Sequence, residues 1–343
     1  MKAVSIRATG MVTSVGYSTA ASCAAIRAKL SNASETTFVD DAGEWVNGHV
    51  IGDRFGSHGF DKLQRMALLS LREALEPLEP ASWARVPLLL CVAESGRPGR
   101  SRELDDEMFL ALEASLGFEL PAPSGIIAEG RVGVVSAIER ARRLLVAGEA
   151  DFVVILAVDS LLTAPSIRRL VEMERLLVSG NSNGFIPGEA ASALLLALPS
   201  GRPELLCEGV GRAHEAAAID SGAPLRAMGL TAAIRAALIE SGCEMHELDF
   251  RITDVAGEQY YFKEAAIALS RLLRRRRERF DLWHPAEAVG EVGAAIGPIV
   301  VGVADVAFRK GYAPGARVLC HFSADGGARA ALVLRHSKAT ASG

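Results

Sequence analysis

The sequence predicts an α/β fold built from two similar halves, residues 1–200 and 201–337, each with a buried sheet and covering helices. Three observations favour it. Hydrophobic residues make up 50% of the 343 residues but aromatic residues only 6%, so Ala, Val, Leu and Ile dominate the core. Several segments are continuous apolar runs, which is typical of strands covered on both faces. The order of strand-like and helix-like segments also recurs in the second half.

In the first half, a strand is expected at residues 3–12, interrupted by a glycine turn. A helix follows, and Ser18 or Thr19 can cap its amino end. The remaining elements follow from apolar runs for strands and helical spacing for helices: helices at 20–30, 62–76 and 132–147, and strands at 88–92, 152–158 and 190–198.

The second half repeats this order of strands and helices. We expect strands at 205–209 and 250–255 and helices at 230–241 and 264–277. A closing hairpin at 318–322 and 330–335 surrounds the glycine pair Gly326 and Gly327. The last six residues, 338–343, are small and polar and are predicted to be disordered.

Composition excludes several classes of function. The net charge of −4 gives no global attraction to nucleic acid. The five cysteines have no CxxC spacing, so neither a disulfide framework nor a zinc site is expected. No apolar run approaches the ~18 residues of a membrane span, and no signal peptide is evident. We therefore expect a cytoplasmic protein that binds no metal, cofactor, nucleic acid or membrane.

Several motifs, taken in order, resemble the ketoacyl synthase branch of the thiolase-like condensing enzymes. They are the opening TGMVTSVG at residues 9–16, the GEAD that precedes the strand at 152–158, and GFIPGEAA at 184–191, followed by Gly293-Ala294-Ala295 and the terminal glycine pair. The resemblance spans nearly the whole chain. It implies a five-layered α-β-α-β-α duplication, the 3-oxoacyl-[acyl-carrier-protein] synthase II type of fold, and a homodimer.

The resemblance also implies a cysteine nucleophile at a helix amino end and two histidines that stabilise developing negative charge. A gapless alignment places the cysteine on Gly130, and a one-residue slip places it on Glu129 or Arg131. The first histidine falls on Ala256. The second falls on Gly290, or on Glu291 after a slip. No aligned position carries a thiol or an imidazole, so the sequence predicts a degenerate active site.

The final loop is expected to border the substrate pocket. Where the resemblance implies apolar residues beside the paired glycines, this chain has Ser323 and Asp325 before Gly326 and Gly327. A carboxylate at this turn would oppose an oxyanion rather than stabilise it.

Two carboxylates allow an alternative to a degenerate site. Glu129 and Glu291 could form an acid/base pair in an altered active site. The plainer interpretation is that Glu129 caps a helix and complements its dipole. Glu264 is a candidate for the carboxylate downstream of the first histidine position. Cys91 and Cys320 are alternative nucleophiles, although both fall in strands expected to be buried.

A basic cluster marks the end of the helix predicted at 264–277. It consists of Arg271, Arg274, Arg275, Arg276 and Arg277. Such a cluster could dock an acidic partner such as an acyl carrier protein. It could equally be a solvated helix end favoured by the helix dipole.

The leading hypothesis is a non-catalytic binding or assembly factor. The chain resembles ketosynthase-like proteins without the catalytic cysteine that are encoded beside type VI secretion components, and it would then help to load an effector. One alternative is a 3-oxoacyl-[acyl-carrier-protein] synthase or acyltransferase with an altered site. Another is a non-catalytic partner subunit of an active ketosynthase.

Overall fold

The computed structural model describes residues 2–55 and 59–337, and the predicted tail 338–343 lies outside them. The helices are α1 Thr19–Arg27, α2 Gly59–Leu75, α3 Asp106–Leu116, α4 Gly133–Ala147, α5 Ala164–Glu172, α6 Met228–Ser241, α7 Gln259–Leu272, α8 Ala286–Val289 and α9 Ile296–Arg309. The strands are β1 Val4–Val12, β2 Ser34–Val39, β3 Trp45–Gly48, β4 Leu88–Cys91, β5 Gly125–Ile127, β6 Phe152–Ser160, β7 Glu189–Ala197, β8 Leu205–His214, β9 Phe250–Thr253, β10 Leu282–Trp283, β11 Arg317–Ser323 and β12 Ala328–His336.

Ten strands form one sheet, in the order β10-β9-β11-β12-β8-β1-β7-β6-β4-β5. Read outward from the centre, β8-β12-β11-β9-β10 matches β1-β7-β6-β4-β5 element for element. The two series join where residues 4–6 of β1 pair antiparallel with residues 205–207 of β8. This symmetry fits the predicted repeat, while the boundary drawn at residue 200 stays a prediction.

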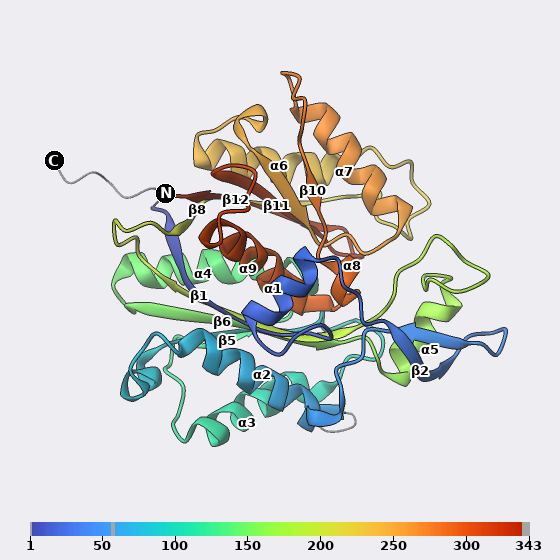
Figure 1. Cartoon of the computed structure of the whole chain (residues 1–343), viewed down its shortest axis with the longest axis horizontal. Helices are drawn as coiled ribbons and strands as arrows, with labels where there is room; N and C mark the ends of the chain where they lie inside the picture. The colour runs from blue at the N-terminus through green and yellow to red at the C-terminus, as the bar shows by residue number, and fades with distance from the viewer. Residues whose placement is uncertain (1, 56–58, 338–343) are drawn as a thin grey trace.

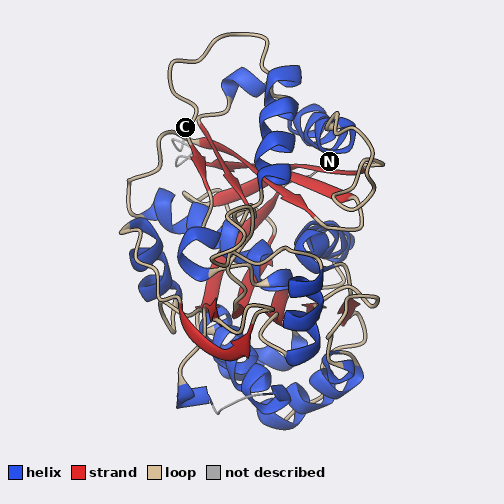
Figure 2. Ribbon diagram, turned by 90° about the vertical axis from the view of Figure 1, so that its right-hand side faces the viewer, coloured by secondary structure: helices blue, strands red, loops and turns tan. Residues whose placement is uncertain are grey.

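The elements stack in five layers (Figure 1). Helices α2 and α3 cover the outer face of the first five strands, and α6 and α7 cover the outer face of the other five. Helices α4 and α9 lie between the two series and pack against strands of both. Figure 2 shows the same alternation of helices and strands from the side. The layering confirms the predicted α-β-α-β-α fold.

A glycine in the first strand of each half lets a helix approach closely. A Cβ at Gly10 of β1 would lie 1.9 Å from the carbonyl oxygen of Ser70 on α2. A Cβ at Gly211 of β8 would lie 1.9 Å from the carbonyl oxygen of Ala233 on α6. Real Cβ atoms never come this close to backbone, so both positions require glycine.

The elements that were predicted have the predicted type, but α3, α5, α8, α9, β2, β3, β5 and β10 were not predicted. The helix predicted at 264–277 runs instead from Gln259 to Leu272, because Leu273 leaves the helical region (φ −77°, ψ 102°). Helix α9 was not predicted: its sequence is a nearly continuous apolar run that contains Pro298, and periodicity alone does not distinguish such a run from a buried strand. Among the described residues, no helix is both long and apolar enough to cross a membrane.

Candidate functional site

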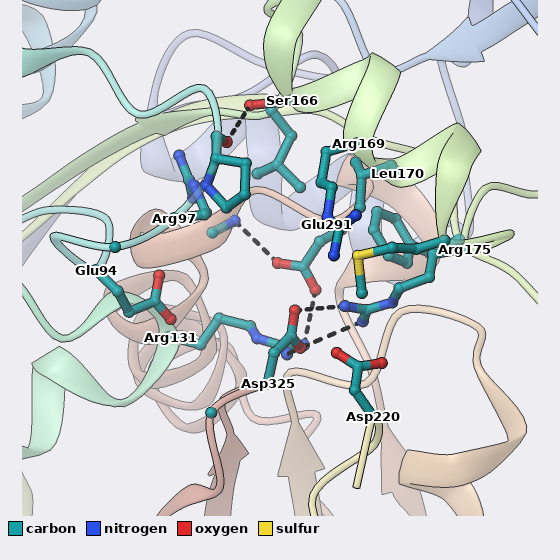
Figure 3. A pocket seen from close by; sticks show the side chains of 17 residues that line it. Glu94, Arg97, Arg131, Ser166, Arg169, Leu170, Arg175, Asp220, Glu291 and Asp325 are labelled. Carbon is teal, nitrogen blue, oxygen red and sulfur yellow. Dashed lines mark hydrogen bonds and ion pairs between the residues drawn. The ribbon is translucent and has the colours of Figure 1, made fainter. Parts of the chain in front are cut away.

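A cavity of about 370 Å³ opens where the amino ends of α4 and α9 approach each other. Its walls come from loops that follow the carboxyl ends of strands, the usual position of a ligand site in an α/β fold. Four arginines and four acids line it: Arg97, Arg131, Arg169 and Arg175, with Glu94, Asp220, Glu291 and Asp325 (Figure 3).

Gly130, the expected nucleophile position, begins a short turn of 3-10 helix that leads into α4. Its φ of +54° is a left-handed conformation that favours glycine. A Cβ at Gly130 would lie 2.2 Å from a carboxylate oxygen of Glu94. The Glu94 carboxylate thus occupies the volume that a side chain at this position would need.

Arg131, the next residue, is buried and turned into the cavity floor. Its guanidinium donates to Glu291 Oε2 at 3.0 Å and to the Tyr261 hydroxyl at 3.0 Å. It also pairs with Asp325, and its Nε lies 3.9 Å from Asp254 Oδ2. Arg131 belongs to the first half and all four partners to the second, so this network joins the halves across the cavity floor.

Arg175 extends the network from the segment after α5. Its guanidinium forms a fork with Glu258, at 2.7 and 2.6 Å, and pairs with Asp325. Figure 3 shows Arg131 and Arg175 meeting at the Asp325 carboxylate. The Tyr261 hydroxyl also donates to Asp325, so three donor side chains converge on that carboxylate. Although burial opposes it, Arg131 and Arg175 hold the pKa of Asp325 well below its usual range.

The network holds four carboxyl groups, those of Asp254, Glu258, Glu291 and Asp325, but two guanidinium groups. Burial raises the pKa of Glu291 to about 7, against the opposing attraction of Arg131. Burial also raises the pKa of Asp254. Burial thus shifts the pKa values of Glu291 and Asp254 upward, whereas the two guanidinium groups keep that of Asp325 low.

The structure gives Glu129 and Glu291 different surroundings. Glu129 Oε2 accepts from Ser136 Oγ and, at 2.9 Å, from Arg212 on β8, and its side chain is 37% exposed. The side chain of Glu291 is 6% exposed and is held by Arg131 and by the backbone N–H of Gly293. That they form an acid/base pair stays a prediction.

The two expected histidine positions carry no imidazole. Ala256 is partly buried and packs against the core. Gly290 has a φ of +78°, and a Cβ there would lie 2.6 Å from the ring of His49. His49 is buried beside Ser14 Oγ, at 3.3 Å, and burial lowers its pKa to about 4. Sequence reasoning missed His49, which lies far from Gly290 along the chain.

The final loop is held by buried polar contacts. The Ser323 backbone N–H donates to Asp254 at 2.9 Å, and its hydroxyl donates to Glu264 at 3.0 Å. The same Glu264 forms a fully buried pair with Arg329, at 2.8 Å. Of the predicted pocket residues, Asp325 and Gly326 line the cavity. Ser323 and Gly327 lie behind it: a Cβ at Gly327 would meet the backbone of Glu215 at 2.6 Å.

The five cysteines are all buried and unpaired. Burial raises the pKa values of both alternative nucleophiles, Cys91 and Cys320. The imidazole of His321, adjacent to Cys320, bonds Thr253 instead, and burial lowers its pKa to about 3. Neither thiol therefore has the exposed, electropositive surroundings that activate a nucleophile. In the described ranges, no group of His, Cys, Asp and Glu side chains is arranged to hold a metal.

The basic cluster lies away from the cavity. Tyr261, in the network, is near the amino end of α7, and Arg271 is near its carboxyl end. Ten helical residues separate them, a span of about 15 Å. Arg274, Arg275 and Arg276 follow the helix as an exposed loop, and Arg277 donates to the carbonyl oxygens of His246 and Leu248. The expectation that these arginines end a helix is confirmed for Arg271, in the last turn of α7, and was wrong for Arg274, Arg275, Arg276 and Arg277.

Sequence reasoning missed four of the seven network residues, Asp254, Glu258, Tyr261 and Arg175, and also Glu94 beside Gly130. Glu94, Asp254 and Glu258 come just after apolar strands, which is the signal that could have marked them, because strand ends meet at one edge of a sheet. Tyr261 and Arg175 give no such signal. Arg175 lies on a segment with no predicted element, and only the folded chain brings it beside Asp325.

Comparison with known proteins supports the fold. No family model and no curated protein matches the chain. One similar structure is described as a type II PKS acyl-carrier protein in complex with its ketosynthase bound to the hexaketide (TM-score 0.81, 15% identity, covering 98% of this chain and 100% of that one). A second is a ketosynthase in complex with its chain length factor from Xenorhabdus doucetiae (0.77, 16%, 98% and 98%). A third is a β-ketoacyl synthase from Burkholderia phymatum (0.77, 13%, 98% and 100%).

At these identities the likeness establishes the fold. The chain has the thiolase-like α/β fold of ketosynthases and chain length factors, as the motifs of the sequence implied.

Proposed function

We propose that this protein is a non-catalytic, ketosynthase-like subunit that acts by binding another protein instead of condensing acyl chains. The observation that carries the proposal is the Arg131 network. Beside the expected nucleophile position, Arg131 is fixed by Glu291, Tyr261 and Asp325 across the cavity floor. A condensing site needs that space for a thioester and needs free donors for its developing negative charge.

Two further observations support the proposal. The aligned triad positions are Gly130, Ala256 and Gly290, none of which carries a nucleophile or a general base. The Glu94 carboxylate lies where a nucleophilic side chain would project. A carboxylate there would repel an enolate or oxyanion electrostatically. The missing triad side chains and the Glu94 carboxylate both oppose the condensation reaction of a ketosynthase.

The partner is the finer part of the proposal. One neighbour of the same fold is a ketosynthase bound to its chain length factor, so an active ketosynthase is the partner we favour. A type VI secretion effector, suggested by the sequence resemblance, is the second candidate, and an acyl carrier protein the third. We also propose that the chain forms a homodimer when no partner is present.

An acylation experiment tests the loss of catalysis. The purified protein is incubated with acyl and malonyl thioesters, and its intact mass is measured by mass spectrometry. A ketosynthase that has its catalytic cysteine serves as the positive control. We expect an adduct on the ketosynthase and none on this protein. An adduct that disappears in Glu129→Ala would contradict the proposal and support the altered-site enzyme.

Copurification from a native lysate tests the partner. Recovery of a ketosynthase supports the partner-subunit proposal, whereas recovery of a secretion effector supports an assembly factor. Recovery of the protein as a homodimer alone, with neither partner, would contradict both.

A further inference from the structure

The outer helices of the second half have an unusual surface. The exposed positions of α6 include Met228, Ala232, Arg235 and Ile239. Their spacing of i, i+4, i+7 and i+11 places them along one face of the helix. Met228 is 56% exposed and Ile239 is 74% exposed. An outward helix face is normally polar, so this α6 stripe is a candidate contact surface.

A basic segment runs beside the α6 stripe. Arg271 Nε donates to the carbonyl oxygen of Arg226, just before α6. Arg277 donates to the carbonyl oxygens of His246 and Leu248, just after α6. The segment is therefore anchored near both ends of α6, whose 14 residues span about 21 Å. Figure 1 shows the loop after α7 on the same outer side of the molecule as α6.

Three cations of this segment form no hydrogen bond or ion pair within the described residues: the exposed side chains of Arg274, Arg275 and Arg276. Arg277 pairs with Asp249 at 3.7 Å. The backbone N–H of Glu244, with a smaller contribution from Arg275, lowers the pKa of Glu247. Glu278 is the exposed acid of the same segment. The only acids on α6 and α7 are committed elsewhere: Glu240 pairs with Arg142, and Glu264 pairs with Arg329 in the core.

The first half provides an internal comparison, because its outer helices α2 and α3 occupy the matching layer. Their exposed charged residues have both signs: Asp61, Arg65, Arg72, Asp106 and Glu107. Those of α6 and α7 are all basic: Arg235, Lys263 and Arg271. The wholly basic character of the exposed charges thus belongs to one half and is not a consequence of the fold.

We infer that the α6 stripe and the basic segment form a docking face for an acidic amphipathic helix of a protein partner. The apolar side chains at i, i+4 and i+11, those of Met228, Ala232 and Ile239, suit the apolar face of a helix laid alongside α6, and Arg235 at i+7 adds a cation to the stripe. The arginines lie where the acidic side chains at the border of that helix would point. This inference rests on the proposed binding function and specifies the chemistry of its partner.

Binding of a designed peptide tests the inference. The probe is a fluorescent helical peptide with leucines on one face and glutamates on the other, and its anisotropy is measured with the full chain. Controls are a scrambled peptide of the same composition, duplex DNA, and vesicles containing phosphatidylserine. We expect the amphipathic peptide to bind better than every control, and more weakly as salt rises from about 50 to about 200 mM.

Two variants separate the contributions of the α6 stripe and of the arginines to peptide binding. Ile239→Glu should weaken peptide binding at least tenfold, by placing a carboxylate in the apolar stripe. The triple change of Arg274, Arg275 and Arg276 to serine should weaken binding and flatten its salt dependence. The matched control is Leu110→Glu on α3, an exposed leucine (63%) of the first half, which should change binding less than twofold.

Equal binding of the scrambled peptide, or stronger binding of DNA or vesicles, would overturn the inference. So would binding that Ile239→Glu leaves unchanged. None of these outcomes involves acyl adducts, so failure of the docking face is distinguishable from failure of the proposed loss of catalysis.

Discussion

Gly130 and Glu94 are the two residues that most directly define the altered site. The left-handed φ of Gly130 and the carboxylate beside it mean that two separate features resist a side chain at this position. The first is backbone strain, which depends only on Gly130. The second is displacement of the Glu94 carboxylate, which depends on both residues.

A double-mutant cycle separates these two features. We expect Gly130→Ala to lower the free energy of unfolding by about 1–2 kcal/mol through the backbone, plus the cost of moving Glu94. Combining it with Glu94→Ala should recover at least about 0.5 kcal/mol, which chemical denaturation can measure. Strict additivity of the two changes would mean that Glu94 does not occupy this space.

Glu291 gives a pH-dependent prediction, because burial raises its pKa from 4.5 to about 7. The folded state then binds more protons than the unfolded state between these values. Its contribution to stability is complete below about pH 4.5 and is lost as pH rises through 7. The charged groups facing it are Arg131, Asp254 and Asp325.

Glu291→Gln removes this titration. Relative to the natural protein, we expect the variant to gain up to about 3 kcal/mol of unfolding free energy as pH rises from 5 to 8. Urea denaturation across that range measures the difference. A difference that does not change with pH would show that Glu291 titrates normally.

At the level of elements, the fold depends on close contact between the first strand of each half and the helix that covers it. Gly10→Ala and Gly211→Ala each place a methyl group 1.9 Å from a helix carbonyl oxygen. We expect each change to lower the free energy of unfolding by about 1–3 kcal/mol, because strand and helix must separate.

The control for these variants is Gly180→Ala. Gly180 is exposed, and its Cβ would meet nothing within 4 Å. Its effect should stay within about 0.5 kcal/mol. Equal effects at all three glycines in denaturant melts would contradict the close-contact explanation.

Helices and strands with a clear periodic signal could be predicted from the sequence. Ser18 does cap α1, accepting a hydrogen bond from the Ala21 N–H at 3.2 Å. Helix α9 could not be predicted because it is buried on nearly every side. The helix was predicted to continue through the basic segment because arginine is a good helix former. In the structure Arg277 instead donates to the backbone carbonyl oxygen of Leu248.

For the molecule as a whole, the repeated strand order and the likeness to ketosynthases agree on one fold. The site was only partly predictable. Arg131 and Glu291 were singled out from their positions, but the ion network depends on distances between segments far apart in the chain. Arg175 and Asp325 are separated by 150 residues and pair directly, a contact that no local pattern encodes.

The central proposal concerns the whole molecule: the condensing-enzyme fold serves here for binding and not for condensation. Decarboxylation of a malonyl thioester tests this most directly, because it needs no acylated cysteine and reports the remaining capacity of the site to stabilise an enolate. The assay follows acetyl thioester formation by mass spectrometry, with a ketosynthase as positive control. We predict that acetyl thioester forms no faster with this protein than in its absence. Formation that is faster than this background, and that is abolished in Glu291→Gln, would contradict the account.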